Sequence, residues 1–305
     1  MISASDVRVA EQRIAGRVRR TPVLDTGPVI FKLEYLQHAG SFKTRGMLNQ
    51  ILAGAERGAL PEAGIIAASG GNAGLAAAYA ARELGVPAEV YVPLNAPAVK
   101  VAKLTKLGAR VVQIGSEYAE AYAAAVVQAD VTDALFCHAY DDADMVAGNG
   151  TLGLELAHQL PDGFDTVLVA VGGGGLAAGI AAALPAEVRV VAVEPATCPA
   201  LHAALEAGGP VDVPVSGVAV DSLGARRVGG IAYEMAVLTS MTSVLVDDQA
   251  IVDARRQLWE DYRIVVEHGT AAAQAALLSG AYVPAAGERV VVLLCGANTN
   301  PGDLA

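Results

Sequence analysis

Short apolar runs of strand length alternate with helix-length stretches along most of this chain. The run 64–68 precedes a helical stretch at 72–84, and the run 88–92 precedes another at 98–107. The same pattern predicts further strands at 110–114, 166–171, 188–193, 243–246 and 289–294, and further helices at 117–128, 151–160, 248–262 and 268–278. Such alternation is typical of βαβ units, and it indicates mostly parallel sheets with helices on both faces.

The size and composition of the chain favour an α/β enzyme of two lobes. Its 305 residues are 53% hydrophobic, which is enough for a core that tends to split in two. There are 33 glycines and only 5% aromatic residues, a balance that suits close packing of helices on sheets. We therefore expect an α/β fold of two lobes, each a mostly parallel twisted sheet flanked by helices.

Charge and cysteine content narrow the possible partners. The net charge of −11 provides no basic surface for nucleic acid or for an anionic membrane. Cys137, Cys198 and Cys295 are odd in number and widely spaced, which fits a reducing compartment. Residues 6–18 have the pattern of an amphipathic helix and not of a secretory signal. The apolar run 166–186 is long enough to span a membrane, but glycines and a proline interrupt it, so we interpret it as a strand, a turn and a helix. We expect a cytoplasmic protein.

Lys43 is the first candidate for chemistry. It follows a strand that ends near Glu34 and opens a helix that runs through Leu48. The partial positive charge at a helix N-terminus disfavours a second positive charge and so lowers the amine pKa, which favours a nucleophilic lysine. A lysine that is merely solvated is the alternative.

Two glycine turns are candidate anion sites. Ser69, Gly70, Gly71, Asn72 and Ala73 connect a strand to a helix, and exposed backbone N–H groups at such a turn bind carboxylates or phosphates. Asn72 could bond a ligand hydroxyl there or simply cap the helix. The second turn follows the buried strand 167–171 and consists of Gly172, Gly173, Gly174 and Gly175, followed by Leu176. It has the features of a phosphate cradle.

The second turn also fits a different interpretation, a dinucleotide-binding motif. Gly172, Gly174 and Ala177 satisfy G-x-G-x-x-A, and Glu194 follows about twenty residues later, as in dinucleotide-binding enzymes. That pattern would indicate an NAD-dependent oxidoreductase. Cys295, at the carboxyl end of strand 289–294, is either a buried inert thiol or a contact to a cofactor ring.

Taken together, these motifs resemble the serine/threonine dehydratase family of pyridoxal phosphate enzymes, which have a fold like that of the tryptophan synthase β-subunit (fold type II). The segments that carry the resemblance are 32–34, 41–46, 69–74, 139–142, 148–155, 172–175 and 295–296. It implies a large cofactor-binding domain of residues 1–38 and 139–305, a small domain of residues 39–138, and an active site in the cleft between them.

The resemblance also implies roles for individual residues. Lys43 would form a Schiff base with pyridoxal 5'-phosphate, Phe42 would pack beside the ring and Asn72 would bond the ring hydroxyl. Gly172 to Gly175 with Leu176 would hold the phosphate, and Cys295 would face the pyridine nitrogen. Ser69, which is also expected to be catalytic, would bind the substrate together with Gly70, Gly71, Asn72 and Ala73.

The activity implied by the resemblance is β-elimination of L-threonine, L-serine or both, to 2-oxobutyrate or pyruvate and ammonia. Serine racemase, or another pyridoxal phosphate lyase of the same fold, is the alternative. Racemases of this family resemble a pattern with serine at the place of Gly70. This chain has glycine there and would lack a second proton donor. The oxidoreductase, and a binding protein that kept the fold without the chemistry, are weaker alternatives.

Two further expectations come from the resemblance. Glu194 matches the first ligand of the cation site in many relatives. The acidic second ligand of the Mg²⁺-type relatives would fall near Ala200, whose side chain has no oxygen, so K⁺ or Na⁺ would be favoured over Mg²⁺. A purely structural Glu194 is the alternative. The family association also implies a homodimer.

Overall fold

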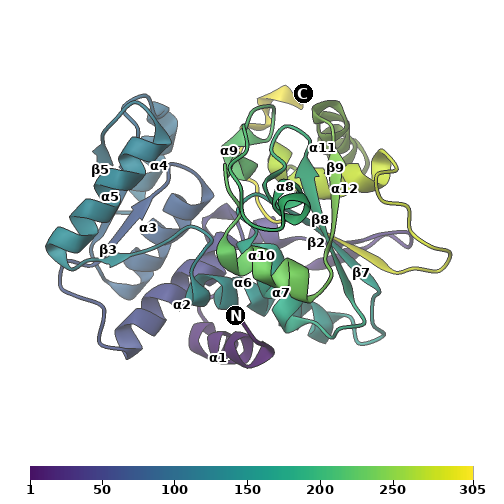
Figure 1. Ribbon diagram of the computed structural model, residues 1–305, viewed down its shortest axis with the longest axis horizontal. Helices are drawn as coiled ribbons and strands as arrows, with labels where there is room; N and C mark the ends of the chain where they lie inside the picture. Colours follow the sequence, from purple (N-terminus) through teal and green to yellow (C-terminus); the bar gives the residue numbers. More distant parts are fainter. Residues whose placement is uncertain (305) are drawn as a thin grey trace.

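In the computed structural model, which describes residues 1–304, the strands form two separate sheets, one in each of two lobes (Figure 1). The smaller sheet has the order β5-β4-β3-β6, and all of its pairings are parallel. Its strands are β3 (Ile65–Ala68), β4 (Ala88–Val92), β5 (Arg110–Gln113) and β6 (Leu135–Phe136). The larger sheet has the order β1-β2-β10-β7-β8-β9. Its strands are β1 (Val23–Asp25), β2 (Ile30–Lys32), β7 (Thr166–Ala170), β8 (Arg189–Pro195), β9 (Thr242–Val246) and β10 (Val290–Leu293).

The prediction of two mostly parallel sheets is confirmed, with one exception at an edge. The β1–β2 pair is antiparallel, and the other pairings of the larger sheet are parallel. The sequence pattern did not predict β1, because this edge strand is only three residues long and two of its residues, Leu24 and Asp25, are exposed. Gly27, with φ of 88°, lies in the turn that reverses the chain into β2.

Helices cover both faces of each sheet, which confirms the predicted layers. On the smaller sheet, Ile65 and Ala67 pack toward α2 (Lys43–Glu56) and α3 (Asn72–Leu84), whereas Ile66 and Ala68 pack toward α5 (Tyr118–Thr132). This alternation is the two-residue period of a strand. α4 (Ala98–Lys106) completes the smaller lobe.

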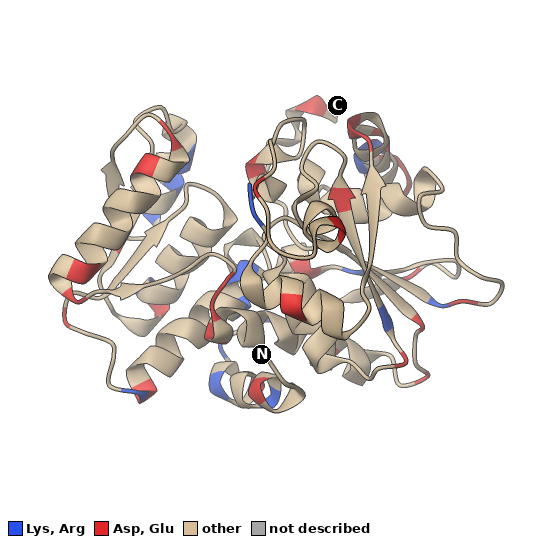
Figure 2. Cartoon of the chain, viewed as in Figure 1, with Lys and Arg blue, Asp and Glu red and all other residues tan. Residues whose placement is uncertain are grey.

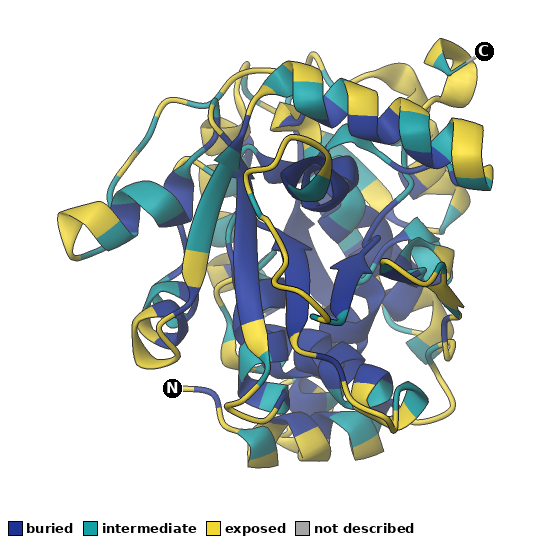
Figure 3. Ribbon diagram, turned by 90° about the vertical axis from the view of Figure 1, so that its right-hand side faces the viewer, coloured by how far each residue is buried: buried dark blue, intermediate teal, exposed yellow. Residues whose placement is uncertain are grey.

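The larger sheet lies between two groups of helices, and its four central strands, β2, β10, β7 and β8, are largely buried (Figure 3). One face packs against α6 (Ala143–Gln159), α7 (Gly175–Ala183), α8 (Ala200–Ala207) and α10 (Gly230–Leu238). The other packs against α11 (Asp248–Tyr262) and α12 (His268–Leu278). The remaining helices are α1 (Ala4–Ile14), whose Val7, Ala10 and Ile14 are buried as expected of an amphipathic helix, and the short α9 (Val220–Leu223).

The start of α6 was predicted too late. The helix begins at Ala143, where the Asp142 side chain caps it by accepting the Met145 amide at 2.9 Å, and not near residue 151. Glycines at 148 and 150 lower intrinsic helix propensity, which hid the first two turns. They are needed for packing: a Cβ on Gly148 would lie 2.7 Å from the Arg45 carbonyl oxygen, and one on Gly150 would lie 2.6 Å from that of Gly179.

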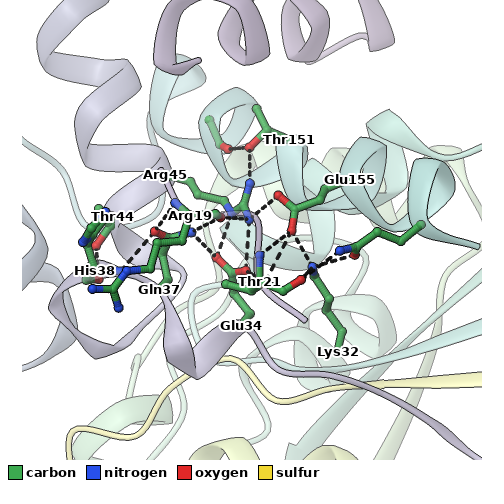
Figure 4. A network of polar contacts seen from close by, with 12 residues as sticks. Arg19, Thr21, Lys32, Glu34, Gln37, His38, Thr44, Arg45, Thr151 and Glu155 are labelled. Atoms are coloured by element: carbon green, nitrogen blue, oxygen red, sulfur yellow. Dashed lines mark hydrogen bonds and ion pairs between the residues drawn. The ribbon is translucent and has the colours of Figure 1, made fainter. Parts of the chain in front are cut away.

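A buried network of charged side chains ties α2 to the larger lobe (Figure 4). Arg45 pairs with Glu34 through Nε and Oε1 at 2.7 Å, and with Glu155 through Nη2 and Oε2 at 2.8 Å. Lys32, on β2, also pairs with Glu155 and donates to the Thr21 carbonyl at 2.7 Å. Two positive and two negative side chains balance one another, as buried charges require. The network therefore holds the first turn of α2 against β2 and α6.

The two sheets are consistent with the expected division of the chain, whose boundaries stay a prediction. β3 to β6 all lie within residues 39–138. Acidic residues lie on helices of both lobes, α5 and α10 among them (Figure 2). In residues 1–304, no helix combines the length and the apolar character that crossing a bilayer requires.

Candidate active site

Lys43 is the first residue of α2, as predicted, and its amine is partly buried between the lobes. Its Nζ donates a hydrogen bond to the carbonyl oxygen of Ala139 at 2.6 Å and lies 4.9 Å from the centroid of the Phe42 ring. Loss of hydration lowers the pKa of Lys43 to about 8, against the opposing influence of Cys295 and Glu267. Roughly a tenth of the amine is then neutral at pH 7, compared with well under a thousandth for an ordinary lysine.

The glycine turn after β7 lies against the segment that holds Lys43. A Cβ on Gly173 would lie 2.3 Å from the Tyr140 ring, and one on Gly175 would lie 2.5 Å from the Tyr140 carbonyl oxygen. Gly174 has φ of 84° and is the N-cap of α7. Within residues 1–304, no backbone acceptor is bonded to the N–H groups of Gly173, Gly174 or Gly175. Unpaired amides at a helix N-terminus fit an anion such as a phosphate group.

The segment 139–142 is part of the family resemblance, which implied no role for its individual residues. The structure shows what each of them contacts. The Ala139 carbonyl accepts from Lys43, and Tyr140 covers Gly173. The Asp141 carboxylate accepts the amides of Gly230 and Ile231 at 3.0 and 3.1 Å, at the start of α10. Asp142 caps α6. The segment therefore joins the lysine, the glycine turn and two helix starts.

The loop Ser69 to Ala73 connects β3 to α3 in the smaller lobe. The Ser69 hydroxyl accepts the Gly71 amide at 3.2 Å. The capping interpretation of Asn72 is wrong: Gly71 is the N-cap of α3, without a side-chain cap bond, because Asn72 already lies within the helix. The Asn72 Nδ2 instead donates to Glu267 Oε1 at 2.6 Å, and its Oδ1 accepts from Asn298 Nδ2 at 2.7 Å.

Cys295 follows β10 at the carboxyl edge of the larger sheet, where ligands of open α/β sheets bind. It is 5% exposed, and its Sγ lies 3.4 Å from the Thr270 hydroxyl. Burial raises the pKa of the Cys295 thiol to about 12, so the thiol is neutral at physiological pH. The Cys295 carbonyl accepts the Phe42 amide at 3.0 Å, which places the thiol beside the start of α2. Leu176, in the first turn of α7, is buried.

The sequence pattern assigned no contacts between the two lobes here, and the structure shows two. Glu267, the N-cap residue of α12, contacts Asn72 of the smaller lobe; burial raises its pKa to about 7. Lys100 of α4 pairs with Asp221 of α9 at 3.1 Å, beside Gly70 and Gly71. Neither contact has a local sequence signal, since the partners are more than a hundred residues apart.

Glu194 lies away from these groups, and its carboxylate is occupied. Oε1 accepts the Leu201 amide at 2.7 Å, and Oε2 accepts the His202 amide at 2.8 Å and the Ser243 hydroxyl at 3.1 Å. This arrangement stabilises the start of α8 and agrees with the structural alternative. Within residues 1–304 no three His, Cys, Asp or Glu side chains form a group suited to a metal ion, and the cation stays a prediction.

Known proteins match nearly the whole chain. A family model described as pyridoxal-phosphate dependent enzyme matches residues 14–296. The L-threonine ammonia-lyase of Geobacter sulfurreducens is 38% identical over 97% of this chain and 76% of its own length. Among solved structures, a threonine deaminase from T.th. is 33% identical with a TM-score of 0.89, covering 98% of this chain and 99% of that one. Maize serine racemase is 29% identical with a TM-score of 0.92, covering 99% and 95%.

Proposed function

Because the chain belongs to the family of pyridoxal-phosphate dependent enzymes, we propose that it eliminates water from L-threonine, L-serine or both and releases ammonia with 2-oxobutyrate or pyruvate. The observation that carries the proposal is the Lys43 amine, whose lowered pKa makes it a base near neutral pH, and which residues 139 and 140 connect with amides ready for an anion. Threonine ammonia-lyase among the relatives supports the substrate class.

The residues of the cleft fit the cofactor. Gly172 to Gly175 and Leu176 would hold its phosphate at the start of α7, where unpaired amides and the helix dipole favour an anion. Lys43 would hold its aldehyde carbon, Asn72 its ring oxygen and Cys295 its ring nitrogen, with Phe42 beside the ring. When bound, the cofactor supplies an electron sink for the carbon that bears the amino group.

The other steps belong to the chain itself. The substrate carboxylate would rest on the amides at the start of α3 and on the Ser69 hydroxyl, which orients the α-hydrogen toward Lys43. The neutral Lys43 amine takes this proton, and its contact with the Ala139 carbonyl holds the amine in place. The Cys295 thiol is neutral and provides no negative charge for a ring nitrogen, which favours elimination over transamination.

Serine racemase is the second candidate, and the structural similarity to maize serine racemase supports it. A racemase needs a proton donor on each face of the substrate carbon. Position 70 is glycine and carries no side-chain donor, and a Cβ there would face Val92 at 3.5 Å. Elimination needs only the single base, Lys43, and is therefore the function that the site supports best.

The deciding assay measures ammonia and 2-oxo acid release from L-serine, L-threonine and their D-forms, with chiral chromatography of the remaining amino acid. We expect equal amounts of ammonia and 2-oxo acid from an L-hydroxy amino acid, without accumulation of the D-form. Accumulation of D-serine faster than ammonia would establish the racemase instead. If the protein bound pyridoxal phosphate but turned over none of these compounds, the proposed activity would be wrong although the cofactor site stands.

Gly174→Ala is expected to weaken cofactor binding at least about tenfold, because the residue has φ of 84° and a new Cβ would lie 2.4 Å from that of Ala232. Strain of this kind costs about 1–3 kcal/mol and would move the amides of the turn. Titration of the apoenzyme with pyridoxal phosphate, followed by absorbance, measures the loss. Gly163→Ala is the matched control, since Gly163 has φ of 78° with nothing within 4 Å of a new Cβ. Equal affinities for the two variants would contradict the assigned phosphate site.

The remaining expectations belong to the same proposal. The enzyme acts on a small amino acid as a homodimer in the cytoplasm; the resemblance supports the dimer, and three unpaired cysteines support a reducing compartment. Light scattering during size-exclusion chromatography tests the dimer. Activity in K⁺, Na⁺ and tetramethylammonium buffers tests the monovalent cation.

A further inference from the structure

We propose that Glu267 and Asn298 are positioning residues that hold the Asn72 side chain in one orientation and keep one of its amide N–H groups free for the ring oxygen of the cofactor. The three residues come from the start of α12, the segment after β10 and the start of α3. The inference rests on the proposed cofactor site, and not on which amino acid is the substrate.

The orientation of Asn72 follows from a count of donors and acceptors. A primary amide has two N–H donors and an oxygen with two lone pairs. One donor of Asn72 is used by Glu267 Oε1 at 2.6 Å, and the oxygen receives Asn298 Nδ2 at 2.7 Å. A flipped amide would set its N–H groups against the Asn298 donor and its oxygen against the Glu267 carboxylate. The second N–H of Asn72 therefore remains available in a known place.

Asn298 is itself held in one orientation. Its Nδ2 donates to the Ala39 carbonyl at 2.8 Å as well as to Asn72, so both of its N–H groups are used. The Ala297 amide donates to the Gly40 carbonyl at 3.0 Å. Ala39 and Gly40 lie in the loop that leads to Lys43. The same side chain thus connects the loop before the lysine with the residue expected to bind the ring.

Space for the Glu267 contact depends on a glycine. A Cβ on Gly296 would lie 2.6 Å from Glu267 Oε1 and 3.3 Å from Asn72 Nδ2. The Glu267 amide also donates to the Gly296 carbonyl at 3.2 Å. The chain therefore leaves room directly after Cys295 for a carboxylate to cross to the smaller lobe.

The hydrogen bond from Asn72 to Glu267 should depend on pH. Burial raises the pKa of Glu267 to about 7, and the charges that face it are Asp221 of α9, Lys100 of α4 and Lys43 of α2. The raised pKa means that the carboxyl is neutral below about pH 7 and charged above it. A charged acceptor forms the stronger hydrogen bond, so Asn72 is held most firmly above that pH.

A double-mutant cycle on cofactor affinity separates this role from a merely structural one. Apoenzymes with Asn72→Ala, Glu267→Ala and Asn298→Ala, and the two double variants that contain Asn72→Ala, are titrated with pyridoxal phosphate. Each single change should weaken affinity about three- to tenfold, the loss expected for one hydrogen bond. With Asn72 already removed, the other two changes should alter affinity less than about twofold. Equal losses with and without the Asn72 side chain would overturn the proposal.

Controls and a conservative variant complete the test. Glu260→Ala and Asn95→Ala change exposed residues of the same types and should leave affinity unaltered. Circular dichroism and thermal unfolding identify any variant that does not fold. If Glu267→Ala does not fold, Glu267→Gln replaces it in the test, because glutamine keeps the shape of the side chain and an acceptor oxygen. This variant should bind the cofactor but lose the step in affinity near pH 7. A step that persists in Glu267→Gln contradicts the role assigned to this carboxyl.

Discussion

Lys43→Ala is expected to lower kcat by about 10³-fold or more, because the variant loses both the covalent attachment of the cofactor and the base that takes the α-proton. The Ala139 carbonyl accepts a hydrogen bond from this amine, and loss of hydration lowers the pKa of Lys43 to about 8. Steady-state kinetics of 2-oxo acid release measure the loss. Peptide mass spectrometry after borohydride reduction should find a pyridoxyl adduct on Lys43 in the parent enzyme only.

The matched control for this prediction is Lys103→Ala, which removes an exposed lysine of α4 and should leave both readouts unchanged. The pH profile adds a second check. The neutral amine is the reactive form, so attachment of the cofactor should speed up as the pH rises toward about 8 and level off above it. If the Lys43→Ala enzyme turned over its amino acid at the parent rate, the assignment of Lys43 as the catalytic base would be wrong.

Arg45→Ala is expected to lower the free energy of unfolding by about 3–5 kcal/mol, because it leaves the buried Glu34 carboxylate without its ion-pair partner. The Arg45 and Glu34 side chains are 2% and 0% exposed in their ion pair. Urea unfolding followed by circular dichroism measures the change. Arg57→Ala, at the C-cap of the same helix, removes a pair in which the arginine is 58% exposed, and should cost less than about 1 kcal/mol.

A second variant shows whether the loss comes from an unpaired charge. Arg45→Met combined with Glu34→Gln removes both members of the pair and should recover part of the stability lost in Arg45→Ala. If Arg45→Ala cost no more than Arg57→Ala, the network would not be the anchor of α2. If the double variant were less stable than Arg45→Ala, packing and not charge would account for the loss.

Local patterns were enough to predict most of the elements. The helices at 72–84, 248–262 and 268–278 have the predicted bounds, since apolar periodicity and helix starts are properties of neighbouring residues. The early part of α6 was missed because its glycines have low helix propensity, and only the close approach of α2 and α7 shows why they are present. The capping interpretation of Asn72 failed for a similar reason: the partners of its side chain are distant in the chain.

The sequence by itself determined the two mostly parallel sheets, the lysine at a helix start and the glycine turns, because each depends on contacts between near neighbours or on one residue type. Only the tertiary structure decided that Glu194 supports α8, that Glu267 and Asn298 hold Asn72, and that Arg45 anchors α2. The physical reason is that a buried polar group takes whichever partner the fold brings within hydrogen-bond distance. Those partners are set by how the lobes and layers pack.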